Sequence, residues 1–539
     1  MVSRFERFFQ SEKAVIFLLA AIALIPRLYM LYIYSRYSGD GVSYLSTAIY
    51  LKNPDLIGEV PKRIYFILYP SLTLLFDFIF NNIALSGRVL NLLIGTVIPP
   101  IVYLLGRKLL TRKAAFFAAV LCVFNPILIE QSVGIRGDNL FALMTLVAIY
   151  VFESCDWLKP NVRDALLLAL VLGLTQLTRT NGLMYLLVII PIWIVWIKKG
   201  HIPLRAWAIK TLIPFLLLFF AIFMIPHIFL AIRGEKPPSM FVYTYLDGNI
   251  AATADREEVF FKLNLDATEY QFLEDVAQTE LREILTDWTI LPAKYIRNFK
   301  YCLELLFNPI IDVLLKLSIF LLPLLFYLFY YSGEIQIPSG LKRTVFWAWP
   351  SFFLLPAINI ENLYFLPLIP VLMLVLAWIF DAASALGWIS KWRNWIFIIL
   401  ICVVLVPECV QLSQLINNER NYRNPYIPAG EWINENSDMQ TRIMARDPEV
   451  FFHAFRHGYR MPYEDLNRTL IFALHKGITY IVFGPTEQEK RRELFFSAYE
   501  EIFKMGDKSR IELVETIDTG KDKVFILKLV PENFKVTEF

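Results

Sequence analysis

Long apolar segments recur along most of the chain, and they constrain the fold more than any other feature of the sequence. A helix that crosses the apolar core of a bilayer needs roughly 20 consecutive, mostly apolar residues. Segments that suit such a helix lie at residues 14–34, 86–105, 114–133, 139–153, 164–178, 181–197, 207–231, 310–331, 343–358, 363–380 and 394–412. The sequence therefore predicts a polytopic α-helical membrane protein with about eleven transmembrane helices. Its 57% hydrophobic and 19% charged residues agree with this class.

Lysine and arginine residues in the short loops predict how the helices are oriented. Alternate loops are basic, with examples at residues 107–108 and 198–199, and the N-terminal segment is basic too. Such loops favour the cytoplasmic side. Residues 1–412 are thus expected to form a transmembrane domain with a cytoplasmic N-terminus, in the plasma (inner) membrane. Its segments 35–85 and 232–309 are expected to be extracytoplasmic loops.

The end of the chain, residues 413–539, predicts a small extracytoplasmic α/β domain. Strands are expected at 441–445 and 479–483, and a hairpin at 511–517 and 523–530. Helices are expected at 466–476 and 487–505, where apolar residues recur on one face. This region contains no glycine-rich phosphate loop and no nucleophile elbow. It is therefore expected to bind or support rather than to catalyse.

Charged residues gather at the outer ends of the predicted spans, where charge is costly and marks candidates for function. Asp40 follows a glycine turn at the start of a helical segment, and Tyr44 lies one turn later on the same face. Lys62 and Arg63 begin an amphipathic segment that suits the headgroup layer. The other candidates on this side are Glu130, Arg136, Asp138, Arg179, His227, Glu361 and Tyr364.

Five segments, in order, resemble the GT-C glycosyltransferases, which are membrane enzymes that take sugars from polyprenyl-phosphate carriers. This class includes protein O-mannosyltransferases and aminoarabinose transferases. The segments are 39–48, 86–91 running into 102–107, 124–126 followed by Asp138, 173–182 and 363–370. The chain has Gly41 and Ser43 where aminoarabinose transferases carry an acidic residue and an arginine, and it lacks the oligosaccharyltransferase signature Trp-Trp-Asp-Tyr-Gly. The resemblance therefore implies a fold and a reaction class, without a particular sugar.

The reaction implied by the resemblance is an inverting transfer from a polyprenyl-phosphate sugar donor to a hydroxyl group of a glycan, lipid or protein acceptor. Asp40 is the expected general base. Substrate binding is expected from Tyr44, Lys62, Arg63, Glu130, Arg136, Asp138, Arg179, Glu361 and Tyr364. No cofactor is required, and a divalent metal held by His227 stays open. The net charge of +3 gives no reason to expect a nucleic acid as partner.

Structural roles compete with these functional ones. Asp40 could simply cap a helix, Lys62 and Arg63 could bind lipid headgroups, and Arg179 could pair with Asp138. The rival function is a lipid or solute transporter, for which repeated halves and charges at mid-membrane depth are typical. A membrane scaffold without catalytic activity is a second alternative. Loss of sugar transfer in a folded Asp40→Asn variant would favour the enzyme.

Overall fold

The computed structural model describes residues 11–36, 39–54, 62–200, 203–235, 295–300, 337–353, 366–385 and 393–534. Their contacts divide the chain into two compact units. The first unit comprises the described residues within Met1–Tyr34, Thr47–Pro238 and Tyr295–Arg420. The second comprises those within Ser35–Ser46 and from Asn421 onward.

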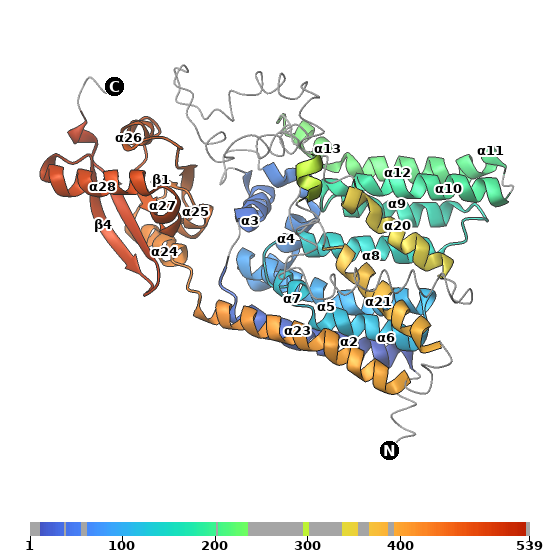
Figure 1. Ribbon diagram of the computed structural model, residues 1–539. Coiled ribbons are helices and arrows are strands. Elements are labelled where there is room, and N and C mark those ends of the chain that lie inside the picture. The colour runs from blue at the N-terminus through green and yellow to red at the C-terminus, as the bar shows by residue number, and fades with distance from the viewer. Residues whose placement is uncertain are drawn as a thin grey trace. The chain divides into compact units, whose positions relative to one another are not determined.

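Helices make up the first unit, as Figure 1 shows. They are α2 (Glu12–Ile33), α3 (Gly39–Lys52, whose first residues belong to the second unit), α4 (Leu68–Phe80), α5 (Ile83–Leu109), α6 (Arg112–Phe124), α7 (Pro126–Gln131), α8 (Asp138–Ser154), α9 (Val162–Gln176), α10 (Leu186–Gly200), α11 (Leu204–Trp207), α12 (Ile213–Phe223), α13 (Ile225–Ile232), α20 (Ser339–Phe353), α21 (Leu368–Ala385) and α23 (Arg393–Asn421). Short 3₁₀ helices occupy Lys62–Phe66 and Thr180–Tyr185, and a π turn joins α11 to α12.

Several of these helices are apolar, as expected for a membrane protein. Among the described residues, four are long and apolar enough to cross a bilayer, namely Glu12–Ile33, Ile83–Leu109, Gly182–Gly200 and Leu204–Phe223. The predicted helical membrane architecture is confirmed, whereas the predicted number of spans is not. One predicted span, 310–331, lies outside the described residues. Another, 114–133, is divided into α6 and α7, because Pro126 has no N–H with which to continue α6.

Helix α5 forms the core of this unit. Within its apolar segment 72% is buried, and it packs against α2, α4, α6 and α8. Small residues along its length, such as Gly87 and Gly95, let side chains of neighbouring segments approach closely. Asn82 caps the start of the helix, because its side chain accepts a hydrogen bond from the Leu85 N–H (2.9 Å).

The second unit contains the predicted α/β domain. Its strands are β1 (Arg442–Ala445), β2 (His457–Arg460), β3 (Tyr480–Phe483), β4 (Ile511–Asp518) and β5 (Lys523–Leu529), and its helices are α24 (Tyr426–Asn436), α25 (Pro448–Ala454), α26 (Leu466–His475), α27 (Pro485–Lys490) and α28 (Arg492–Met505). The strand order is β2-β1-β3-β5-β4. Strand β1 runs parallel to β2 and β3, while β5 runs antiparallel to β3 and β4.

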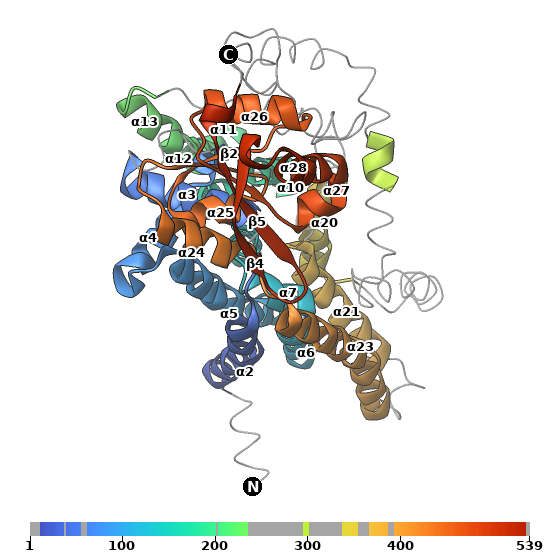
Figure 2. The ribbon, with the colours of Figure 1, turned by 90° about the vertical axis from the view of Figure 1, so that its left-hand side faces the viewer.

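Helices cover both faces of this sheet. Met444 and Ile481 point into one apolar core together with residues of α26 and α28. Their neighbours Ile443 and Val482 point into a second core with residues of α24 and α25, because side chains alternate along a strand. Figure 2 shows α24 and α25 on one side of β4 and β5 and α28 on the other.

The predicted strands and the hairpin of this domain are confirmed, and three elements were not foreseen. These are α24, α25 and the strand β2, whose sequence His-Gly-Tyr-Arg has no alternation of apolar and polar residues. The predicted helix 487–505 is two helices, α27 and α28, which meet at Arg491. The predicted domain boundary after residue 412 falls inside α23.

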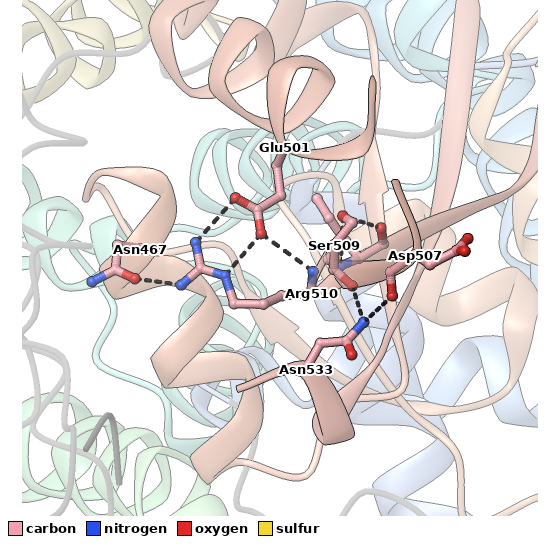
Figure 3. A network of polar contacts seen from close by, with 7 residues as sticks. Asn467, Glu501, Asp507, Ser509, Arg510 and Asn533 are labelled. Atoms are coloured by element: carbon pink, nitrogen blue, oxygen red, sulfur yellow. Dashed lines mark hydrogen bonds and ion pairs between the residues drawn. The ribbon is translucent and has the colours of Figure 1, made fainter. Parts of the chain in front are cut away.

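A group of polar contacts joins α28 to the strand that follows it (Figure 3). Arg510 Nε lies 2.9 Å from Glu501 Oε1. The Nη1 atom of Arg510 donates a hydrogen bond to Asn467 of α26. Asn533 Nδ2 donates to the backbone oxygens of Asp507 (3.0 Å) and Ser509 (2.6 Å). Burial alone would raise the pKa of Glu501, but the hydrogen bonds and charge of Arg510 leave that pKa lowered.

Candidate functional site

The turn between α7 and α8 brings three of the predicted site residues together. Asp138 is the first residue of α8, where the helix dipole favours a carboxylate. Its side chain is 1% exposed, and Oδ2 lies 3.3 Å from Arg136 Nε. Its other oxygen, Oδ1, lies 2.5 Å from Nη2 of Arg179, which follows α9. One carboxylate therefore joins two chain segments through two guanidinium groups.

The cluster brings two guanidinium groups to one carboxylate in a largely buried setting. The Arg179 side chain is 5% exposed and that of Arg136 is 21% exposed. Since burial lowers the effective dielectric, charges in this cluster interact more strongly than they would on an open surface. A phosphate group is the kind of ligand that paired arginines recognise.

The segment that carries Arg179 is held by its own residues. Gln176 Oε1 accepts a hydrogen bond from the Leu183 N–H (2.8 Å), which closes the turn around Arg179. A Cβ atom at Gly182 would lie 2.7 Å from Gln176 Cα, so only glycine permits this approach. The predicted motif 173–182 thus folds compactly around Gln176.

Asp40 and Tyr44 lie in the first turns of α3. Asp40 is half-buried and Tyr44 is 1% exposed. Both belong to the second unit, in which the segment before them contacts Tyr422. The Arg36 guanidinium lies 4.2 Å from the centre of the Tyr422 ring, and Ser35 Oγ donates to the Tyr422 backbone oxygen (3.4 Å). The segment that leads to Asp40 is therefore joined to the chain that enters the α/β domain.

The remaining predicted site residues are more scattered. Lys62 and Arg63 begin the 3₁₀ helix Lys62–Phe66, and Glu130 lies near the end of α7. His227 of α13 packs between aromatic rings, 5.2 Å from Tyr65 and 5.7 Å from Phe223 between ring centres. The part of the chain that the structure describes contains no group of three His, Cys, Asp or Glu residues suited to a metal. Glu361 and Tyr364 lie outside the described residues.

Buried polar residues around the α7–α8 turn were not predicted. Arg27 of α2 is fully buried and donates to the backbone oxygens of Ala23 (2.9 Å) and Val123 (3.2 Å) and to Ser132 Oγ (3.1 Å). The sequence could have indicated Arg27, because an arginine in the middle of an apolar span is rare and usually has a specific partner. Asn91, also buried, gave no such signal.

The comparisons with known proteins bear on this arrangement. No curated protein matches the chain significantly. Residues 67–229, which include Arg136, Asp138 and Arg179, match the family model described as dolichyl-phosphate-mannose-protein mannosyltransferase. The solved structure of ArnT from Cupriavidus metallidurans bound to undecaprenyl phosphate is similar over 96% of this chain and 98% of that chain, with a TM-score of 0.58 and 11% identity.

The chain has the GT-C fold. A second solved protein with this fold, the oligosaccharyltransferase AglB from Archaeoglobus fulgidus in complex with an inhibitory peptide and a dolichol-phosphate, matches 91% of this chain and 71% of its own. The TM-score is 0.52 and the identity 11%. The resemblance to GT-C glycosyltransferases that five sequence segments indicated is thus confirmed.

Proposed function

We propose that the protein is a membrane glycosyltransferase that moves a sugar from a polyprenyl-phosphate donor to an acceptor hydroxyl group. The observation that supports this most is the Arg136–Asp138–Arg179 cluster, which holds two guanidinium groups, within the segment that matches the mannosyltransferase family model. The shared GT-C fold adds support, because proteins with this fold have been solved with undecaprenyl phosphate and with dolichol-phosphate.

In the proposed reaction the acceptor oxygen attacks the anomeric carbon of the sugar. The bond between that carbon and the phosphate oxygen breaks, and its electron pair stays on the phosphate. The acceptor proton passes to the Asp40 carboxylate, which acts as general base. Attack from the face opposite the phosphate inverts the anomeric configuration. Because phosphate is a good leaving group, no general acid is needed.

Arg136 and Arg179 are proposed to stabilise the negative charge that develops on the leaving phosphate. Lys62 and Arg63 are proposed to contact the same group from the extracytoplasmic segment. Contacts to the sugar or the acceptor are assigned to Tyr44, Glu130, Glu361 and Tyr364. An oligosaccharyltransferase from A. fulgidus has been solved with zinc and sulfate. The aromatic surroundings of His227 do not fit a metal site, so no step is assigned to a metal.

The acceptor is proposed to be a glycan, lipid or protein on the outer face of the plasma (inner) membrane. This follows from the basic loops, which favour a cytoplasmic N-terminus and an extracytoplasmic α/β domain. The C-terminal domain is assigned no chemical step.

Purified protein incubated with a panel of polyprenyl-phosphate sugars and candidate acceptors tests the proposal. Release of polyprenyl phosphate that requires an acceptor supports a glycosyltransferase. Movement of the donor between the leaflets of a vesicle, without its cleavage, would instead support the rival transporter. Including a chelator in parallel samples decides whether a metal ion takes part.

A further inference from the structure

One face of α5 carries Gly87, Asn91 and Gly95, each four residues from the next and therefore aligned along the helix. The turn that precedes Asp138 packs against this face. A Cβ atom at Gly95 would overlap Ser132 Oγ, and a Cβ at Gly87 would lie 3.3 Å from Ile135 Cγ2. The two glycines thus allow the turn to contact the helix directly, on either side of Asn91.

Asn91 holds this turn through its side-chain amide. It is fully buried, and its Nδ2 donates to the backbone oxygen of Arg136 (2.9 Å) and to that of Gly134. Its own backbone oxygen accepts from Asn139 Nδ2 of α8 (3.4 Å). The Asn91 side chain therefore holds the backbone of the turn at two places, Gly134 and Arg136.

A second layer of buried polar groups lies beneath this contact. Ser132 Oγ accepts from Arg27 Nε (3.1 Å) and from Asn139 Nδ2 (3.5 Å), and it donates to the Leu128 backbone oxygen. These residues are fully buried. A buried polar group that loses its partner costs about 1–3 kcal/mol, so the turn has few alternative arrangements of similar energy.

We propose that Asn91 is a positioning residue of the site: it sets the backbone of the turn so that Arg136 and Asp138 meet Arg179 in the geometry that receives the donor phosphate. This inference rests on the proposed function. Asn91 does not touch the substrate but acts through Arg136, so its contribution to activity depends on the presence of that arginine.

Hydrogen exchange of the full-length protein tests the structural half of the inference without any substrate. The Asn91→Asp variant has the same shape but replaces the Nδ2 amide group, the donor of both bonds, with a carboxylate oxygen that repels the Gly134 and Arg136 carbonyls. The amides of residues 133–138 are expected to exchange about tenfold faster or more, since roughly 1.4 kcal/mol is lost. Thr96→Val on the same helix, which removes only a bond to the Leu92 backbone (2.7 Å), is the control and should leave this turn unchanged.

A double-mutant cycle tests the functional half. In the wild-type background, Asn91→Asp is expected to raise the KM for the donor about tenfold. In an Arg136→Gln background the same change is expected to add less than about twofold, because the group it positions is absent. A role in general stability would instead give equal losses in both backgrounds. If Asn91→Asp does not fold, Asn91→Ala takes its place in both experiments.

The outcomes separate this inference from the proposed function. Unaltered exchange of residues 133–138 in Asn91→Asp overturns the inference, whether or not the protein is active. Equal losses in both backgrounds, in an active enzyme, also overturn it and leave the proposed function standing. Absence of activity with every donor contradicts the proposed function, and the exchange measurement then still decides whether Asn91 holds the turn.

Discussion

At the scale of single residues, Asp138 is the point where two distant segments meet. Its carboxylate contacts Arg136 on its own turn and Arg179 beyond α9, and its side chain is almost fully buried. Removing one member of a buried ion pair is costly, because the remaining charge stays buried without compensation. Asp138 therefore has a structural role in addition to the one proposed for the cluster.

Asp138→Asn is expected to destabilise the membrane unit by about 3–5 kcal/mol and to raise the KM for the donor, because two guanidinium groups would repel each other without a carboxylate between them. Unfolding in detergent and steady-state kinetics measure the two effects. Asp156→Asn is the control, since its ion pair with Lys159 is exposed and worth at most about 1 kcal/mol. Equal effects of the two substitutions would contradict the assigned role.

The three residues that meet at Asp138 were candidates from the sequence, whereas the buried polar residues around them, Arg27 included, were not. Arg136, Asp138 and Arg179 could be predicted because charge next to an apolar span needs an explanation. Asn91 could not, since its partners lie 43 and 45 residues further along the chain and no local pattern connects them. The same holds for Ser132, whose bond to Arg27 spans 105 residues.

At the scale of elements, the α/β domain contains a buried carboxyl group at the start of α27. Burial raises the pKa of Glu487 to about 7, against the opposing effects of its hydrogen bond from the Gly484 N–H and of the nearby charge of Arg446. The folded state therefore holds a proton that the unfolded chain releases near pH 4.5. The stability that this group contributes is fully present below that pH and is lost as pH rises through about 7.

Glu487→Gln keeps the acceptor oxygen for Gly484 but does not titrate. The variant is expected to gain stability over the wild type as pH rises from about 5 to 8, by on the order of 1–3 kcal/mol. Hydrogen exchange of the β3 and α27 amides in the full-length protein measures this difference. Glu493→Gln, at an exposed position of α28, should show no such dependence. A difference between Glu487→Gln and wild type that does not change with pH would refute the prediction.

The contact between α28 and β4 should respond to pH in the opposite sense. The pKa of Glu501 is lowered in the folded state, so its pairing with Arg510 stabilises the domain above about pH 4.5 and is lost as pH falls. Arg510→Met is expected to cost about 1–3 kcal/mol at pH 7 and less in acid. Exchange of the α28 amides reports this cost. Lys504→Met, which removes an exposed pair with Glu500, should cost less than about 1 kcal/mol.

Elements with strong periodicity were predictable and those defined by tertiary contacts were not. Apolar residues in the hairpin β4–β5 and in the strand β3 predict these strands. Strand β2 has no such pattern and is defined by its pairing with β1. The division between α6 and α7 also depends on long-range contacts. Asn125 caps α7 and donates to Glu408 of α23 (3.2 Å), so the break is stabilised by a residue far along the chain.

At the scale of the whole molecule, the membrane fold could be predicted from apolar spacing together with the ordered family segments. The number of spans could not be established, because proline breaks and short helices blur the relation between apolar length and crossing. The similarity to ArnT extends over nearly the full length of both chains, so the GT-C fold accounts for the chain as a whole. The identity of the sugar and of the acceptor depends on contacts that neither periodicity nor fold specifies.

Asp40 is proposed to remove the acceptor proton during sugar transfer. The most direct measurement is the single-turnover rate of polyprenyl-phosphate release by the wild type and Asp40→Asn, with donor binding measured in parallel. Asp77→Asn, in the same predicted loop segment 35–85, is the control, because Asp77 is paired with Lys52 (2.9 Å). Asp40→Asn is expected to slow release about 10²–10⁴-fold with donor affinity little changed, while the control stays near the wild-type rate. Release by Asp40→Asn at the wild-type rate would contradict the proposed role of Asp40.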